Sequence, residues 1–364
     1  MNNKLIKGIV GLLTLCLIGL FIYHGVNKNK EQSFLNKSVV LKGIITSEKE
    51  NFFRDERVTA IFKKEGLDIQ FERWASGKMA KVSDIKEFGE YADFVFPPGV
   101  QTSDKIKNNL KRAQAYNVFY SPMVVATWKP IEEILKNNNL TIQTNSYTAL
   151  DMNKFLPLMS NKVKWRDLKN SDEYKVNKNV LIYTSDARYS NAAKMFIALT
   201  GYIYNNGEVI TTQEQVNKIS PMIKNLMNAQ GHRESSSTNL LQDYMAIGMG
   251  KTPLVFGYES EFVEQVVKNK AANPKMVLMY PSPTMFTKHV MVIFKPEAKK
   301  LVNLMLTNKE LQQIASEYGF RFAGNNHVKE SAAKYGLTIP EEVVDVVDPP
   351  SFDILEQMVT VIVE

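Results

Sequence analysis

Short apolar runs and amphipathic stretches alternate along residues 38–104. Two runs are apolar and have the length of strands, and a third alternates apolar and polar residues as a strand does. The stretch after the first run places its apolar side chains at helical spacing until Gly66. A β-α-β-α-β order of this kind predicts a parallel sheet with helices on its faces. The predicted strands are residues 39–45, 67–74 and 92–96, and the predicted helix is residues 50–64.

Further strands and helices are predicted up to residue 318, which places the body in the α/β class. The chain has 364 residues, and at roughly 100–200 residues per domain this length predicts about two folding units. The further predicted strands are residues 117–128, 180–184, 252–257, 276–280 and 290–294, and the predicted helices are residues 131–136, 191–204, 238–249, 297–306 and 308–318.

The C-terminal segment is acidic and ends in an amphipathic pattern. Residues 328–364 carry eight acids and two lysines, and their apolar positions from Phe352 to Ile362 follow helical spacing. We predict a final helix there. It either packs on the core or binds a partner protein, and the pattern alone leaves both open.

An uncharged apolar stretch of nineteen residues, Gly8–Val26, precedes the body. As a helix it would be roughly 28 Å long, enough to cross the hydrocarbon core of a bilayer. We predict a transmembrane signal anchor at residues 8–26, with a short cytoplasmic end at residues 1–7 and a linker at residues 27–37. A cleaved signal peptide is an alternative, but no small-residue cleavage site is visible. A lipid anchor on Cys16 is another, although the preceding Leu15 is larger than a lipobox requires.

The net charge of +7 is concentrated at the N-terminus. Residues 1–30 hold four lysines and no acid, which leaves only +3 for the remaining chain. This distribution gives little support for nucleic-acid binding, and we expect no nucleic-acid partner. Two lysines flank each side of the apolar stretch, so charge does not fix its orientation.

Motifs for catalysis, cofactors and metals are incomplete. The four histidines form no pair at ligand spacing, and Cys16 lies in the apolar stretch, so no zinc site is expected. Residues 248–252 resemble the end of a phosphate loop, but Met245 stands where the motif needs glycine. Residues 186–190 begin like a calcium loop, but Arg188 replaces an oxygen ligand. No Gly-x-Ser-x-Gly elbow is present. We therefore expect neither catalysis nor a bound cofactor.

Small and polar residues follow the predicted strands at the points where each strand ends. In open α/β sheets, ligands bind beyond the carboxyl ends of the strands. Ser190 or Asn191 would cap the helix that follows, at a helix end whose free N–H groups suit oxyanions. The strand ends are Thr46-Ser47, Ala75-Ser76-Gly77, Pro98-Gly99 and Thr184–Asn191.

The ordered set of these segments resembles the type II periplasmic-binding-protein fold of bacterial extracellular solute-binding proteins, and most of all the molybdate-type branch that serves ABC transporters. The resemblance covers about residues 38–325. It rests on residues 43–49 (GIITSEK), 71–79 (FERWASGKM), 91–104 (YADFVFPPGVQTSD), 183–195 (YTSDARYSNAAKM), 280–284 (YPSPT) and 311–320 (LQQIASEYGF).

The resemblance implies two lobes that close over a ligand by hinge bending. Lobe 1 would be residues 38–126 with about 285–325, lobe 2 residues 127–284, and residues 326–364 a separate C-terminal segment. The chain would cross between lobes near residues 123–129 and return near residues 284–294. The resemblance implies that Ser47, Ser76 and Gly99 from lobe 1 and Arg188, Ser190 and Asn191 from lobe 2 bind the ligand. It gives less direct support to Thr127, Trp128, Tyr258 and Glu259. Trp74 and Trp128 are candidates for stacking on a ligand.

Charged residues beside the predicted serines depart from a neutral oxyanion pocket. Glu48 and Lys49 follow Ser47, and Arg73 and Lys78 flank Ser76. We therefore expect a small polar ligand. An anionic and a neutral ligand are both left open. The resemblance also implies that the body lies outside the cytoplasm and that its partner is an ABC permease. Members of the family are secreted or lipid-anchored, so the uncleaved membrane anchor predicted at residues 8–26 departs from the family. A ligand sensor or membrane assembly component on the same fold is the alternative, and an enzyme on this scaffold is a third.

Overall fold

The computed structural model describes residues 38–89, 91–324 and 327–363. The predicted anchor at residues 8–26 and the linker at residues 27–37 lie outside the described residues. Within the described part of the chain, every helix is too short or too polar to cross a bilayer.

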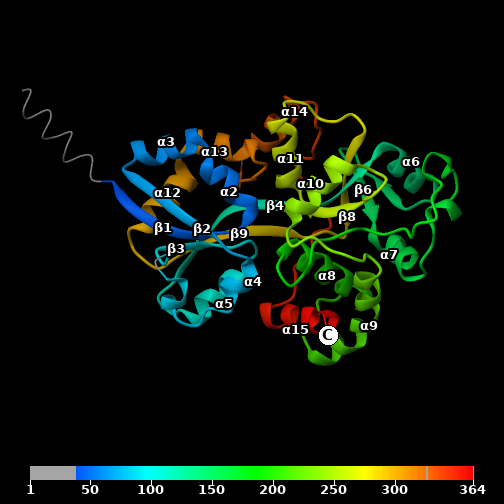
Figure 1. Ribbon diagram of the computed structural model, residues 1–364, viewed down its shortest axis with the longest axis horizontal. Helices are drawn as coiled ribbons and strands as arrows, with labels where there is room; N and C mark the ends of the chain where they lie inside the picture. Colours follow the sequence, from blue (N-terminus) through cyan, green and yellow to red (C-terminus); the bar gives the residue numbers. More distant parts are fainter. Residues whose placement is uncertain (1–37, 90, 325–326, 364) are drawn as a thin grey trace, which may run out of the picture.

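Two sheet-containing halves lie side by side and share one long strand (Figure 1). Lobe 1 contains the order β2-β1-β3-β9-β4, in which β1 pairs in parallel with both β2 and β3, as predicted. Lobe 2 continues from β4 through β8 and β6 to β5, with β7 also on β4. The strands are β1 (Val39–Ile45), β2 (Leu67–Arg73), β3 (Phe94–Phe96), β4 (Gln114–Trp128), β5 (Thr141–Gln143), β6 (Thr148–Asp151), β7 (Val255–Tyr258), β8 (Met276–Ser282) and β9 (Phe286–Ile293).

The shared strand β4 changes sheet in its middle. Its first part, as far as Pro122, pairs with β9, and its second part, from Met123 on, pairs with β7 and β8. The chain returns between Ser282, the end of β8, and Phe286, the start of β9. The change of sheet on β4 therefore lies a few residues before the lobe boundary that we predicted after residue 126.

Helices cover both faces of the lobe 1 sheet. The predicted helix at residues 50–64 is two helices, because Asp55 adopts an extended backbone and its side chain accepts a hydrogen bond from the Arg57 N–H at the start of the second. Phe119 and Phe320 stack at 4.4 Å between ring centroids in an aromatic core. The helices of lobe 1 are α2 (Ser47–Arg54), α3 (Glu56–Lys64), α4 (Ser76–Ala80), α5 (Val100–Asn109), α12 (Ala298–Thr307) and α13 (Lys309–Glu317), with a 3-10 turn at Ile85–Phe88.

Lobe 2 is built around a buried helix, α8, whose first eleven residues are all buried. The strand predicted at residues 180–184 is wrong as a regular strand: only Tyr183 pairs, through a single parallel bridge to Val255. Neighbouring residues bond elsewhere: the Val180 N–H donates to the Val163 carbonyl and the Thr184 N–H to the Gln230 side chain. The helices of lobe 2 are α6 (Lys129–Asn137), α7 (Met152–Ser160), α8 (Asn191–Tyr204), α9 (Gln213–Asn228), α10 (Ser237–Ile247) and α11 (Glu259–Lys268), with 3-10 turns at Trp165–Asp167 and Asp172–Tyr174.

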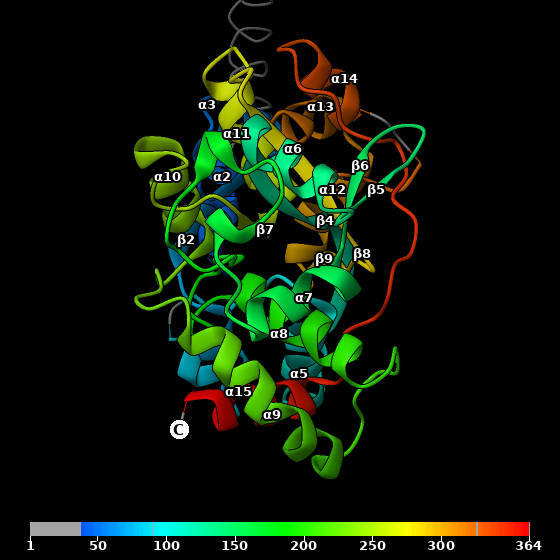
Figure 2. The ribbon, with the colours of Figure 1, turned by 90° about the vertical axis from the view of Figure 1, so that its right-hand side faces the viewer.

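The C-terminal segment wraps around the molecule and ends in a helix that contacts both lobes (Figure 2). After α14 (His327–Ala333) the chain passes the lobe connection, where Val346 forms a bridge with Thr284. The last helix, α15 (Phe352–Val363), then packs against α8 and α9 of lobe 2 and against α5 of lobe 1. The prediction of a final helix is confirmed, and its apolar side packs on the lobe 2 core.

Candidate functional site

A cleft of about 250 Å³ lies where the two lobes face each other. This volume is just below the range of roughly 300–1,000 Å³ typical of small-molecule sites, so it suits a compact ligand. Hydroxyl and amide side chains dominate its walls. The lining residues are Thr46, Ser47, Glu48, Arg73, Trp74, Ala75, Ser76, Pro98, Tyr189, Ser190, Asn191, Ser235, Ser236, Ser237, Asn239 and Tyr258.

Lobe 1 contributes the segments that follow its three parallel strands. The carboxyl ends of parallel strands meet at one edge of a sheet, so the turns after β1, β2 and β3 come together there. Ser47 begins α2 and Ser76 begins α4, and both line the cleft as the sequence predicted. Ser76 is 3% exposed and has no hydrogen-bond partner among residues 38–89, 91–324 and 327–363.

Lobe 2 contributes the starts of two long helices. Ser190 and Asn191 stand at the start of α8, and a run of three serines ends at Ser237, the first residue of α10. This serine run was not among the residues predicted to bind ligand. A Ser-Ser-Ser-Thr stretch directly before a predicted helix is a helix-start signal that could have found it. The positive end of each helix dipole thus faces the cleft.

Ser190 occupies the cap position of α8 but does not cap the helix with its side chain. Its hydroxyl oxygen accepts a hydrogen bond from Ser185 Oγ at 2.7 Å, and the Asn191 side-chain amide donates to the Tyr258 hydroxyl at 3.1 Å. The predicted cap by either residue is therefore wrong. The first N–H groups of α8 receive no side-chain cap, and this leaves them available to a bound anion.

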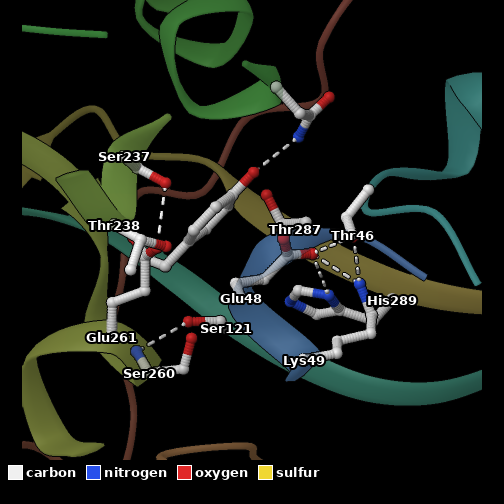
Figure 3. Close-up of polar contacts among 12 residues, drawn as sticks. Thr46, Glu48, Lys49, Ser121, Ser237, Thr238, Ser260, Glu261, Thr287 and His289 are labelled. Carbon is white, nitrogen blue, oxygen red and sulfur yellow. Dashed lines mark hydrogen bonds and ion pairs between the residues drawn. The ribbon is translucent and has the colours of Figure 1, made fainter. Parts of the chain in front are cut away.

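A buried ion pair lies directly behind the lobe 1 wall (Figure 3). Glu48 Oε1 accepts hydrogen bonds from Thr46 Oγ1 and Lys49 Nζ, both at 2.5 Å, and His289 Nδ1 lies 3.6 Å away. Burial on its own raises the pKa of Glu48, but the Lys49 charge and the hydrogen bonds outweigh burial, so the pKa lies well below its ordinary value. Burial, with Lys49 beside it, lowers the pKa of His289 to about 4, so this imidazole is neutral near pH 7.

A second buried carboxyl group supports the lobe 2 wall. Glu261 Oε1 accepts hydrogen bonds from Ser237 Oγ at 3.0 Å and Thr238 Oγ1 at 2.6 Å (Figure 3). Burial raises the pKa of Glu261 to about 8, and the nearby Glu48 charge adds to this effect. Glu261 is therefore mostly protonated at pH 7, so it holds the start of α10 without bringing a second negative charge to the cleft.

Comparisons with known proteins place the fold. No family model and no curated protein matches the chain. Among solved structures, iron-bound HitA from Pseudomonas aeruginosa matches with a TM-score of 0.56 at 13% identity, covering 89% of this chain and 98% of that one. The substrate binding protein of an ABC transporter from Agrobacterium tumefaciens matches with a TM-score of 0.53 at 16% identity (89% and 94% covered), and the ferric binding protein from Campylobacter jejuni with 0.52 at 13% (88% and 97%).

The chain has the type II solute-binding-protein fold. This confirms the fold resemblance drawn from the sequence. At identities of 13–16% the likeness concerns the fold and not the ligand. Among the described residues, no three His, Cys, Asp or Glu side chains gather in a metal-binding arrangement.

Five of the ten residues predicted to bind ligand line the cleft of this solute-binding fold: Ser47, Ser76, Ser190, Asn191 and Tyr258. Gly99 borders it. A Cβ at Gly99 would lie 3.2 Å from Asn191 Oδ1, and the φ of +83° there is one that glycine adopts without strain. Gly99 therefore allows lobe 1 to approach the start of α8. Whether these residues bind a ligand stays a prediction.

The other four predicted residues do not line the cleft. The Arg188 guanidinium binds Asp186 Oδ1 at 3.0 Å and its side chain is half exposed. Thr127 is buried and donates to the Pro253 carbonyl at 2.9 Å, while Trp128 packs against Tyr244. Glu259 is fully buried in an ion pair with Arg321.

Of the two tryptophans proposed to stack on a ligand, Trp74 lines the cleft and Trp128 does not. The Lys78 ammonium lies 3.4 Å from the Trp74 ring centroid, and the indole N–H donates to Glu72. One ring face therefore already has a cation over it.

Proposed function

We propose that this chain is an extracytoplasmic solute-binding protein without enzymatic activity, held at the cell membrane by residues 8–26. It captures a small polar ligand between its two lobes and delivers it to an ABC-type permease. The observation that carries the proposal is the cleft itself: hydroxyl and amide groups from both lobes converge on one compact space, and strand β4 connects the lobes beside it. Lobe closure over a ligand is a common motion of such two-lobed folds.

A thermal-shift screen of the purified full-length protein against oxyanions, amino acids, sugars and polyamines tests this proposal. At a ligand concentration about 100-fold above Kd, a specific ligand adds about 2.7 kcal/mol to the free energy of unfolding. No shift with any compound would contradict solute binding.

The double variant Ser47→Ala/Ser76→Ala should weaken binding of the ligand found in the screen about 10- to 100-fold. Each hydroxyl lost removes a hydrogen bond worth about 0.5–1.5 kcal/mol to the bound ligand. Neither side chain has a hydrogen-bond partner within the described residues, so the unliganded melting temperature should change little. Isothermal titration calorimetry measures the affinity. Ser146→Ala, an exposed serine outside the cleft, is the matched control. Unchanged affinity in the double variant would remove these serines from the ligand site.

The contacts of α15 favour a second candidate, a ligand sensor at the membrane. Lys105 of lobe 1 bonds Asp353 at 2.6 Å, and Lys194 of lobe 2 bonds Glu356, so one helix contacts both lobes. A change in the angle between the lobes would therefore move or release α15. Loss of solute uptake after deletion of the gene would favour transport, and normal uptake would favour the sensor.

A further inference from the structure

Glu48 is an acidic side chain with unusual access to the cleft. It is 7% exposed, yet it lines the cleft at the start of α2. Its neighbours on α2 do not share this position, because Lys49 is fully buried and Glu50, which does not line the cleft, pairs with Arg54 and with the cleft residue Arg73. Glu48 is thus the one acid among the residues that line this cleft.

The two carboxylate oxygens of Glu48 have different surroundings. Oε1 accepts from both Thr46 and Lys49 and faces His289, so its acceptor capacity is used. Oε2 has no partner within the described residues. Oε2 is not fully enclosed by protein atoms. Both ring nitrogens of His289, in contrast, are enclosed and have no hydrogen-bond partner in the described part of the chain. Oε2 is therefore accessible from the cleft that Glu48 lines.

An ionised carboxylate oxygen accepts hydrogen bonds and cannot donate one. Protonation of Glu48 would leave the buried Lys49 ammonium without a counter-charge, so Lys49 favours the ionised form of Glu48. A ligand atom that faces Oε2 must therefore carry a hydrogen. An oxyanion without any proton would place two acceptors against each other and would leave the Glu48 oxygen desolvated and unpaired.

The rest of the cleft favours a negative group. The uncapped N–H groups of α8 and the free hydroxyl of Ser76 are donors. The start of α10 adds the positive end of its helix dipole, although the Ser236 side chain caps the Asn239 N–H. On the basis of the proposed function, we infer that the ligand is a small oxyanion that also carries its own hydrogen-bond donor, with the donor on Glu48 Oε2 and the oxyanion on the helix starts. Glu48 is then the residue that sets specificity.

Matched small carboxylates and inorganic oxyanions test this inference at pH 7 by calorimetry on the full-length protein. Glycine, with an ammonium, and glycolate, with a hydroxyl, are compared with acetate, which has no donor. Hydrogen phosphate is compared with sulfate in the same way. At least one donor-bearing compound should bind about 100-fold more tightly than its donor-free counterpart, since a site built for a donor rejects the analogue without it. The identity of the compound that binds most tightly tells whether an N–H or an O–H donates to Glu48.

The variant Glu48→Gln should reverse this order, because its amide offers a donor as well as an acceptor. Sulfate or acetate should gain affinity and the donor-bearing compound should lose it. Glu48→Gln/Lys49→Met removes both charges and keeps the comparison valid if the single variant does not fold. Glu56→Gln, an exposed acid on α3 outside the cleft, is the control and should leave every affinity unchanged.

Two kinds of negative result are distinguishable. If no donor-bearing compound binds more tightly than its donor-free counterpart, in the carboxylate set and in the phosphate–sulfate pair alike, the role of Glu48 is overturned and solute binding still stands. Binding of a sugar or polyamine alone would do the same. No binding of any of the five compounds or of the wider screen would end the proposed function, and the inference with it.

Discussion

Replacing Arg321 with alanine should lower the free energy of unfolding by about 3–5 kcal/mol. Its guanidinium bonds both carboxylate oxygens of Glu259, at 2.6 and 2.8 Å, and Glu259 is fully buried at the start of α11. Tyr280 donates a further hydrogen bond to the same carboxylate at 2.5 Å. Without the arginine, a buried negative charge would lose its counter-charge. Urea unfolding followed by circular dichroism measures the effect.

A double variant separates the lost pair from the buried charge that remains. Glu259→Gln/Arg321→Met should be less destabilised than Arg321→Ala, because no unpaired charge is left in the interior. Arg166→Ala, at an exposed arginine of lobe 2, should change stability by about 0.5 kcal/mol or less. A loss below about 1 kcal/mol in Arg321→Ala would contradict this account.

The variant Glu261→Gln should be more stable than the native protein at pH 8 and about equally stable at pH 5. The pKa of Glu261 is raised to about 8 in the folded state, above its ordinary value of 4.5. The folded protein therefore holds this proton more tightly than the unfolded chain, and stability falls as pH rises from about 4.5 through 8. The difference between the variants should grow by about 3 kcal/mol from pH 5 to pH 8.

His289 provides the opposite dependence in the same experiment. Its pKa is lowered to about 4, so its contribution makes stability rise with pH between about 4 and 6.5. Because both proteins contain His289, the difference between native and Glu261→Gln isolates Glu261. Melting temperatures by calorimetry at pH 5, 6, 7 and 8 suffice. Parallel curves for the two proteins would show that Glu261 has an ordinary pKa.

The lobe 1 side of the cleft was predictable because it depends on local order along the chain. A buried run that ends in a small polar turn places Ser47 and Ser76 at one edge whenever the strands are parallel. The burial of Glu48 and Lys49 was not predictable. Their charges argued against a compact pocket, but the pair is buried because His289, more than two hundred residues later, covers it from β9. Only the tertiary fold brings that cover into place.

The lobe 2 side depended on contacts that periodicity does not report. Tyr258 lines the cleft and the next residue, Glu259, points to Arg321 instead. Thr127 and Trp128 were assigned to the cleft because the chain crosses there, but β4 carries both into the lobe 2 core. A shift of one position along a strand or helix start changes which space a side chain enters.

Strand β4 constrains how this molecule can move. Pro122 and Met123 are adjacent members of one continuous strand, yet they pair with different sheets. A rotation of one lobe against the other would twist the chain at this change of sheet, and neither Pro122 nor Met123 lines the cleft. If the lobes close over a ligand as proposed, substitutions at Pro122 or Met123 would change the balance between open and closed forms without removing any group that lines the cleft.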